Sequence, residues 1–184
     1  MTWKEIETRR LLLRPPTTED EFTLTAALND FEVSRWLSRV PYPYSHADAR
    51  AFIQWVQNTD ARDRICAITF KSAPGVAIGV IAYEHPAAKD LPDFGYWLGR
   101  AFWRRGIMME AAHALLAHGF DNGIEAFASG YWNPASGALL RKLGFYDAGV
   151  RRTLSLALGH EVDSTRLRLS REMWTSAQEK GRAA

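Results

Sequence analysis

Short apolar runs and longer amphipathic stretches alternate along the 184-residue chain. The apolar run at 11–13 is ended by two prolines at 15–16, which predicts a first strand. Residues that favour β-structure fill 64–71, and apolar residues recur at every second position within 76–83. A further short strand is predicted over 94–98. These four segments predict the first part of a sheet.

Two helices are predicted before residue 60. Thr18 with Glu21 has the pattern of a capping box, which predicts a helix that runs through about Leu28. Ser45 is a good N-cap for a second helix, whose apolar positions are Phe52, Ile53, Trp55 and Val56. The loop between these helices contains the aromatic and proline-rich sequence PYPY.

The strongest helical pattern begins at residue 107. Its apolar positions form two neighbouring stripes, namely Ile107, Ala111, Leu115 and His118, and Met108, Ala112, Leu116 and Phe120. A strand is predicted next, over 125–132. Asn133 then provides an N-cap with Pro134 at the first helical position, and this helix ends before Gly144.

The segments 145–150 and 165–170 alternate as a closing pair of strands. The predicted order is therefore strand, two helices, three strands, helix, strand, helix and two strands. This order predicts an α/β or α+β fold. We expect one domain over residues 1–184, with a core at about 6–172 and a C-terminal tail at 173–184.

Composition and charge narrow the classes of function. The hydrophobic share of 47% indicates a globular chain, and the net charge of +2 gives no strong reason to expect nucleic acid or membrane as a partner. Cys66 is the one cysteine, so no internal disulfide can form. Without a signal sequence or a long apolar run, a cytoplasmic protein is expected. The five histidines lack metal-ligand spacing, so no metal site is expected.

Two strand-to-helix junctions are candidates for a ligand site. The first, 104–108 (RRGIM), combines free N–H groups and the positive end of a helix dipole with a glycine and two arginines, which suits a phosphate group. Its alternative interpretation is a surface turn with solvated arginines. The second, 133–136 (NPAS), is by itself better explained as a helix cap. Two consecutive junctions of this kind can face one crevice at the ends of the strands.

Several segments together are more specific than either junction. They are 94–99 (FGYWLG), 103–111 (WRRGIMMEA), 133–136 (NPAS) and 139–145 (LLRKLGF). Their combination resembles the GNAT superfamily of N-acetyltransferases, and within it the branch that acetylates the N-termini of ribosomal proteins. The segments 8–16 (TRRLLLRPP) and 33–37 (VSRWL) also fit that branch. The similarity covers about residues 6–150.

The resemblance implies a mixed sheet of about seven strands that is splayed open in the middle, with acetyl-CoA in the opening. Main-chain groups of Trp97, Leu98 and Gly99 would hold the pantetheine arm. Asn133 and Ser136 would lie near the thioester sulfur. The N–H groups that would cradle the pyrophosphate belong to Arg104, Arg105, Gly106, Ile107, Met108 and Met109.

The chain departs from the family's pattern in the phosphate loop. Trp103 stands where Gln or Arg is usual, and Met108 stands where a small residue normally allows close approach. Arg104 stands where this branch often has Gly, and it could add an ion pair with a phosphate. These departures motivate an alternative function, a GNAT-like module that binds CoA or an acyl-CoA without catalysis.

Acyl transfer from a thioester requires a neutral amine, a stabilised oxyanion and a stabilised leaving thiolate. Many GNAT enzymes have a catalytic Tyr at the position of Leu140, so Ser136, helped by Asn133, is the predicted substitute. The N–H of Leu98 is the candidate for the oxyanion site. The candidate bases lie near the ends of predicted strands, although ordinary surface placement is the alternative, and they are Glu84, Asp93 and His85.

The expected acceptor is a primary amine. An α-amine of pKa ~8 is about 10% neutral at pH 7, whereas a lysine amine of pKa ~10.4 is only on the order of 0.04% neutral. A protein N-terminus is therefore favoured, with a small-molecule amine left open, and the predicted acceptor loops are 38–46 and 151–163. A homodimer is also left open. Nucleic acid is a further alternative, suggested by arginines that strand alternation partly explains, namely Arg151, Arg152, Arg166, Arg168 and Arg171.

Overall fold

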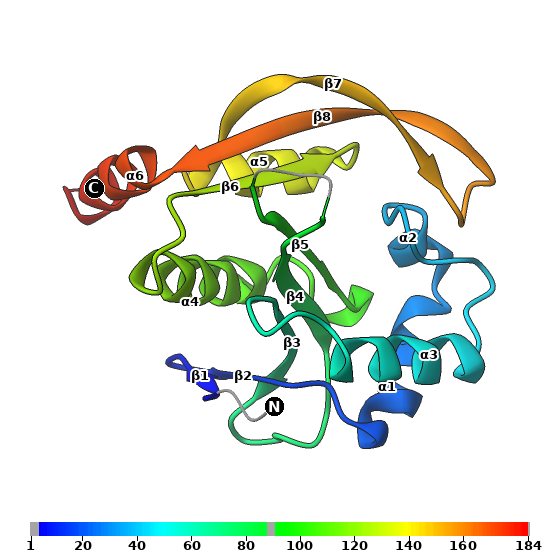
Figure 1. Ribbon diagram of the computed structural model, residues 1–184. Coiled ribbons are helices and arrows are strands. Elements are labelled where there is room, and N and C mark those ends of the chain that lie inside the picture. Colours follow the sequence, from blue (N-terminus) through cyan, green and yellow to red (C-terminus); the bar gives the residue numbers. More distant parts are fainter. Residues whose placement is uncertain (1–3, 88–90, 184) are drawn as a thin grey trace.

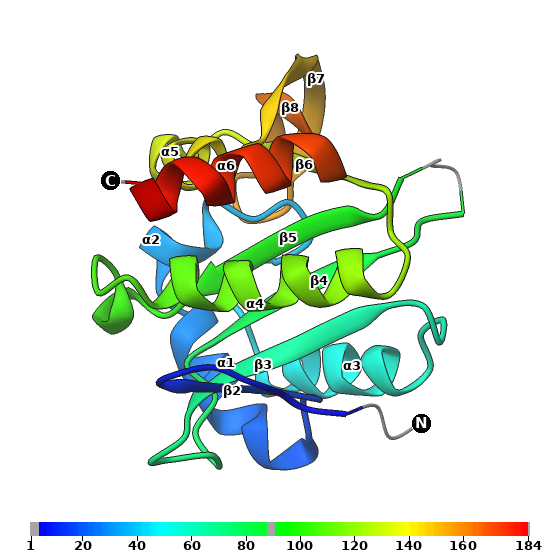
Figure 2. The ribbon, with the colours of Figure 1, turned by 90° about the vertical axis from the view of Figure 1, so that its left-hand side faces the viewer.

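The computed structural model describes residues 4–87 and 91–183, which form one mixed sheet with helices on both faces (Figures 1 and 2). The strands lie in the order β1-β2-β3-β4-β5-β6-β8-β7 across the sheet. They are β1 (Ile6–Glu7), β2 (Leu11–Arg14), β3 (Arg64–Phe70), β4 (Gly79–Glu84), β5 (Asp93–Leu98), β6 (Ala126–Tyr131), β7 (Tyr146–Ser155) and β8 (His160–Ser170).

Helices cover the two faces unequally. Figure 2 shows α4 lying across one face of the sheet, with α1 and α3 behind it. The largest core cluster joins α4, α5 and α6 to the sheet, and a second cluster joins Leu24 of α1 and Ile53 of α3 to β3 and β4. The helices are α1 (Glu21–Leu28), α2 (Phe31–Ser34), α3 (His46–Gln57), α4 (Ile107–Asp121), α5 (Pro134–Lys142) and α6 (Arg171–Ala183).

Every pair of neighbouring strands in the described sheet is antiparallel except β5 and β6. These two strands are parallel because α4 carries the chain back along the sheet between them, as a crossover connection must. The predicted mixed α/β fold is confirmed. The sheet has eight described strands where about seven were expected, because the two-residue strand β1 adds an edge.

The predicted start of the first helix was wrong by one residue. The capping box is formed by Thr17 and Asp20, not by Thr18 and Glu21, and the Thr17 N–H donates to Asp20 Oδ2 at 2.8 Å. A short 3-10 turn at Thr18–Asp20 then leads into α1. The sequence contains two overlapping capping patterns, and spacing alone does not distinguish them. Asp20 is the capping residue in the structure because it is buried and bonded to Arg14.

The predicted strand over 76–83 begins later, at Gly79. The Val76 N–H donates to the Ala73 carbonyl at 3.1 Å, so Val76 belongs to a turn, and its side chain is 46% exposed. β4 itself is buried on both faces over most of its length. The period-two spacing at 76–82 therefore did not mark one buried and one exposed face.

The closing strands are longer than predicted. The segment 151–163, expected to be an acceptor loop, lies mostly within the two strands β7 and β8, whose connection comes after Ser155. A register shift between Asp147 and Val150, with Gly149 at a positive φ of 107°, interrupts β7 where the predicted strand stopped. Within the expected C-terminal tail, the described residues belong to α6.

A buried ion pair joins β2 to the start of α1. Asp20 is fully buried and accepts from Arg14 Nη2 at 2.6 Å and from Nη1 at 2.8 Å. We expect Asp20→Ala to lower the free energy of unfolding by about 3–5 kcal/mol, because it leaves the Arg14 guanidinium without its buried partner. Chemical denaturation measures this loss. Asp147→Ala, which removes an exposed partner of Arg141, should change stability little, and equal losses would contradict the prediction.

Candidate functional site

The sheet opens between β5 and β6. The two strands share one register pair in the described chain, Asp93 with Ala128, next to a bond in which Ser129 Oγ donates to the Phe94 carbonyl at 2.9 Å. Beyond this point β5 keeps its pairing with β4, while β6 pairs with β8. The expected splay in the middle of the sheet is therefore present.

The edge of β5 that faces the opening can be read from the hydrogen bonds around it. The Gly99 N–H donates to the Ile78 carbonyl of the strand on the other side, at 2.9 Å. Because main-chain groups in an antiparallel pair alternate in direction, those of Trp97 face β4, and those of Tyr96 and Leu98 face the opening. The bond from Ser129 to the Phe94 carbonyl fits the same alternation. The geometry thus favours Leu98 over Trp97 and Gly99 as a main-chain contact for a ligand in the splay.

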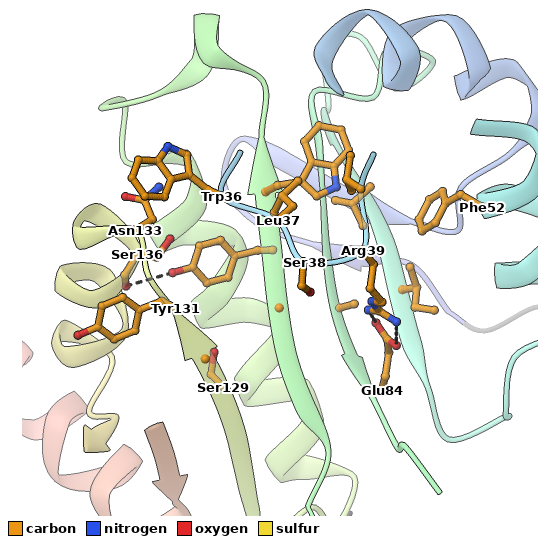
Figure 3. A pocket seen from close by; sticks show the side chains of 18 of the residues that line it. Trp36, Leu37, Ser38, Arg39, Phe52, Glu84, Ser129, Tyr131, Asn133 and Ser136 are labelled. Atoms are coloured by element: carbon orange, nitrogen blue, oxygen red, sulfur yellow. Dashed lines mark hydrogen bonds and ion pairs between the residues drawn. The ribbon is translucent and has the colours of Figure 1, made fainter. Parts of the chain in front are cut away.

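A cavity of about 570 Å³ lies at this opening (Figure 3). One end, called here the α3 end, is formed by the α2–α3 loop and α3, and the other, the α5 end, by the end of β6 and the start of α5. The middle is formed by β3, β4 and β5. The lining residues are Trp36 to Pro41, Tyr44, Asp48, Ala51, Phe52, Trp55, Ile65, Val80, Ala82, Glu84, Gly95, Tyr96, Trp97, Ser129 to Asn133, Ser136 and Leu140.

At the α5 end, the predicted polar residues have different surroundings. Asn133 caps α5, and its side-chain oxygen accepts from the Ala135 N–H at 3.0 Å, so this oxygen has a structural role. Ser136 lines the cavity one helical turn before Leu140, which is buried in the core and offers no hydroxyl. Leu140 therefore cannot act as a general acid.

A second hydroxyl at the α5 end comes from Tyr96, for which the sequence predicted no role. Its hydroxyl donates to the Ser136 carbonyl at 3.3 Å, across the splay. Burial raises the pKa of this phenol well above its usual value, so the group keeps its proton at neutral pH. The sequence does not reveal this contact, because residues 96 and 136 come together only when the crossover through α4 has formed.

The N-terminus of α4 has the backbone of an anion site. Arg104 and Gly106 both have left-handed conformations, with φ of 59° and 68°. No side chain caps the first turn of α4, whose first residues are Ile107, Met108 and Met109. Arg104, Arg105 and Gly106 are exposed. Free N–H groups, the helix dipole and two guanidinium groups are thus presented together to the solvent.

A hydrogen-bond network anchors this loop to the start of the chain. Glu110 in the first turns of α4 accepts from Arg10 Nε at 2.6 Å, from the Arg10 N–H at 2.8 Å and from Thr8 Oγ1 at 2.7 Å. Arg10 Nη1 also donates to the Arg105 carbonyl at 3.1 Å. Burial raises the pKa of Glu110, but the bonds from Thr8 and Arg10 outweigh it and lower the pKa overall. Nothing in the local sequence marked this contact, because its partners lie about a hundred residues apart.

The two bulky departures from the family pattern have different consequences. The Met108 side chain is only 9% exposed and packs in the main core, so it does not stand over the loop. Trp103 is partly exposed, and its indole N–H donates to the Leu98 carbonyl at 2.6 Å. That carbonyl already has a partner, and the Leu98 N–H is the main-chain donor of this residue that faces the splay.

Of the three candidate bases, Glu84 is the one that lines the cavity in the described structure. Arg39 from the α2–α3 loop binds it with both Nη atoms, at 2.6 and 2.9 Å (Figure 3). Asp93 is paired with Arg166 at 3.3 Å and is not part of the lining. His85 contacts Asp63 through its main-chain N–H and its Nδ1.

The remaining residues considered as possible ligands or nucleophiles are accounted for by packing. His118 Nδ1 lies 3.2 Å from the Tyr83 hydroxyl, and the ring of His113 packs on Trp174. Cys66 is free and buried. Among the described residues, no group of three or more His, Cys, Asp or Glu side chains could hold a metal ion.

Comparison with known proteins adds the family to this geometry. Residues 10–146, more than half of the chain, match the acetyltransferase (GNAT) domain family. The chain belongs to this family. Membership makes it an N-acetyltransferase that uses acetyl-CoA, as the sequence resemblance implied.

Individual members of the GNAT family are distant from this chain. The N-acetyltransferase YoaA of Bacillus subtilis (strain 168) is 25% identical over an alignment of 175 residues, which covers 86% of this chain and 92% of YoaA. A GCN5-related N-acetyltransferase from Brucella melitensis superposes with a TM-score of 0.79 at 20% identity, over 98% of this chain and 84% of that one. The ribosomal L7/L12 α-N-protein acetyltransferase RimL, solved with coenzyme A, gives 0.75 at 21% identity, over 91% and 98%. These structures share the GNAT fold.

None of the helices in the described ranges combines the length and the apolar character needed to cross a lipid bilayer. The cytoplasmic location expected from the sequence stays a prediction.

A substitution at Arg104 tests whether this residue, whose left-handed backbone is strained, contributes to the binding of an anion. A left-handed non-glycine residue costs roughly 1–2 kcal/mol, and glycine adds about 0.5–1 kcal/mol of chain entropy to the unfolded state. We therefore expect Arg104→Gly to leave the free energy of unfolding unchanged or up to about 1 kcal/mol higher. The dissociation constant for CoA should rise roughly three- to tenfold, less so at high salt, in titration calorimetry. Arg62→Gln removes a distant exposed charge and should not change it. Equal affinity of both variants would refute a role for Arg104 in binding.

Proposed function

We propose that this GNAT enzyme transfers the acetyl group directly from acetyl-CoA to a primary amine while both substrates occupy the cavity at the splay. The observation that carries the proposal is the continuity of the cavity. Its α5 end contains the hydroxyl groups of Ser136 and Tyr96, and its α3 end contains the carboxylate of Glu84. A thioester and an amine can therefore meet without an acyl-enzyme intermediate.

The residues proposed to hold acetyl-CoA follow the main-chain geometry. The N–H groups from Arg104 to Met109 receive the pyrophosphate, since no side chain caps the helix that begins there. The pantetheine arm lies along the edge of β5 that faces the opening, where the main-chain groups of Tyr96 and the Leu98 N–H are directed. The Trp103 indole holds the Leu98 carbonyl and fixes this edge.

In the proposed reaction, the amine nitrogen attacks the thioester carbon, and the Leu98 N–H stabilises the oxyanion that forms. The new N–C bond then replaces the C–S bond, and the electron pair of the C–S bond leaves on the CoA thiolate. Ser136 donates a hydrogen bond to that sulfur, and Tyr96 donates a second one after its hydroxyl turns away from the Ser136 carbonyl. A thiol pKa of about 8.5 makes the thiolate a fair leaving group, so donors that keep their protons are sufficient. The amine proton passes to water or to Glu84 through water.

A protein N-terminus or a small-molecule amine is the proposed acceptor. The α-amine argument from acid–base equilibria supports it, because such an amine needs little help from a base. The similarity to RimL, whose name describes acetylation of a protein α-amine, supports the same class of acceptor. A homodimer stays an open expectation.

Ser136→Ala and Tyr96→Phe test the two sulfur donors. Each should lower kcat on the order of 10- to 100-fold because a donor to the leaving thiolate is lost, with KM for acetyl-CoA changed less than about threefold. Release of CoA thiol during acetylation of a primary amine measures this. Tyr83→Phe makes the same chemical change at a phenol outside the cavity, bonded to His118, and should keep full activity. Wild-type protein that binds CoA in calorimetry but acetylates no amine would instead favour the binding module.

A further inference from the structure

The α3 end of the cavity is unusually rich in aromatic surface. Phe52 and Trp55 stand at positions i and i+3 of α3, so they share one face of the helix, and their ring centroids are 6.0 Å apart. Trp55 is 41% exposed, although Ile53 between them is fully buried in the core. Both aromatic residues line the cavity. Together they give this end of the cavity an apolar wall of the kind that lines ligand pockets.

The α2–α3 loop, which forms the same end of the cavity, is held in place from the other half of the sheet. The Leu156 N–H, in the connection between β7 and β8, donates to the Ser38 carbonyl at 3.1 Å. The Trp132 indole N–H donates to the Arg35 carbonyl at 3.2 Å. Figure 1 shows the β7–β8 hairpin arching across toward α2, which agrees with these bonds. The α2–α3 loop is therefore seated before any substrate arrives, as in a preformed pocket.

The charges at this end favour a cation. The charged residues among those that line the cavity are Arg39, Asp48 and Glu84, so the lining has one negative charge in excess. Arg39 binds Glu84 and lies over the Trp55 ring, with Cζ 5.5 Å from the ring centroid. A carboxylate and a tryptophan face around one guanidinium form the kind of surroundings that also stabilise an ammonium group.

We infer that the acceptor is a primary amine next to a bulky apolar or aromatic group, which packs against Phe52 and Trp55. The inference rests on the proposed function and deepens it. The negative excess attracts the ammonium form of such an acceptor, and the apolar wall removes its side group from water. The same negative excess would repel an acidic group beside the amine. Either a peptide N-terminus with a large apolar first residue or an arylalkylamine has this chemistry.

A panel of matched acceptors tests the inference. The peptides Phe-Ala-Ala, Ala-Ala-Ala and Asp-Ala-Ala are compared at saturating acetyl-CoA, together with phenethylamine and ethylamine. We expect kcat/KM for Phe-Ala-Ala to exceed that for Ala-Ala-Ala by roughly 10- to 100-fold, the range for burying one large apolar side chain. Asp-Ala-Ala should be the poorest peptide. The faster of Phe-Ala-Ala and phenethylamine identifies the source of the acceptor, and either one, if faster than its small counterpart, supports the inference.

Two variants connect the preference to the wall. Trp55→Ala should reduce the ratio of kcat/KM for Phe-Ala-Ala to kcat/KM for Ala-Ala-Ala at least fivefold, because the wall that binds the large side chain is lost. Tyr146→Ala removes another exposed aromatic residue, one that does not line the cavity, and should leave the ratio unchanged. Thermal unfolding checks that both variants are folded, and Trp55→Leu replaces Trp55→Ala if the latter is not.

The outcomes distinguish a failure of the proposed function from a failure of the inference about the acceptor. If no amine is acetylated although CoA binds, the proposed function fails and the inference fails with it. If amines are acetylated but Ala-Ala-Ala or Asp-Ala-Ala equals or exceeds Phe-Ala-Ala, and ethylamine equals phenethylamine, the inference is overturned and the proposed function stands. A ratio that Trp55→Ala leaves unchanged also overturns the assignment of the apolar group to this wall.

Discussion

The separation of β5 from β6 is the constraint on which the rest of the site depends. Each strand completes its hydrogen bonds on its other side, β5 with β4 and β6 with β8, over six register pairs each. The two halves of the sheet can therefore part after Asp93 and Ala128 without disturbing either ladder. What the parting leaves open is one edge of β5, and a buried polar edge must find a partner. In the proposed complex, acetyl-CoA lies in the opening and supplies such a partner.

Contacts that cross the opening determine its shape. Tyr96 reaches across to Ser136, and Trp132 and Leu156 hold the α2–α3 loop through main-chain carbonyls. At the far edge, Glu110 anchors the phosphate loop to Arg10. These bonds join segments that are far apart in the chain, so the site is complete only when the whole domain has folded. The bonds that stabilise the fold therefore also preorganise the cavity for two substrates.

The sequence predicted what local chemistry decides. Ser45, Asn133 and Gly144 mark helix ends, and they do so in the structure because capping involves only a few neighbouring residues. The family motifs predicted the splay, which the structure shows, and a phosphate loop, which stays a prediction. Long-range contacts decided the rest. Asp20 became the capping partner because Arg14 holds it, and the segment 151–163 extended as strands because each had the other to pair with. Arg39, Tyr96 and Glu110 gained their roles from partners 40 to 100 residues away, and no local pattern records such a partner.

The pair of Arg39 and Glu84 limits how the amine can lose its proton. Both oxygens of Glu84 are bonded to the guanidinium, so this carboxylate can take a proton only when Arg39 moves. Arg39 can move, because its side chain is 69% exposed while the loop that carries it is fixed by main-chain bonds at Arg35 and Ser38. An arriving ammonium group could therefore replace the guanidinium on Glu84 and over Trp55. Recognition of the acceptor and release of the base would then be one event. If this exchange takes place, an acceptor without a positive charge gains nothing from it, and an amine that arrives protonated is favoured.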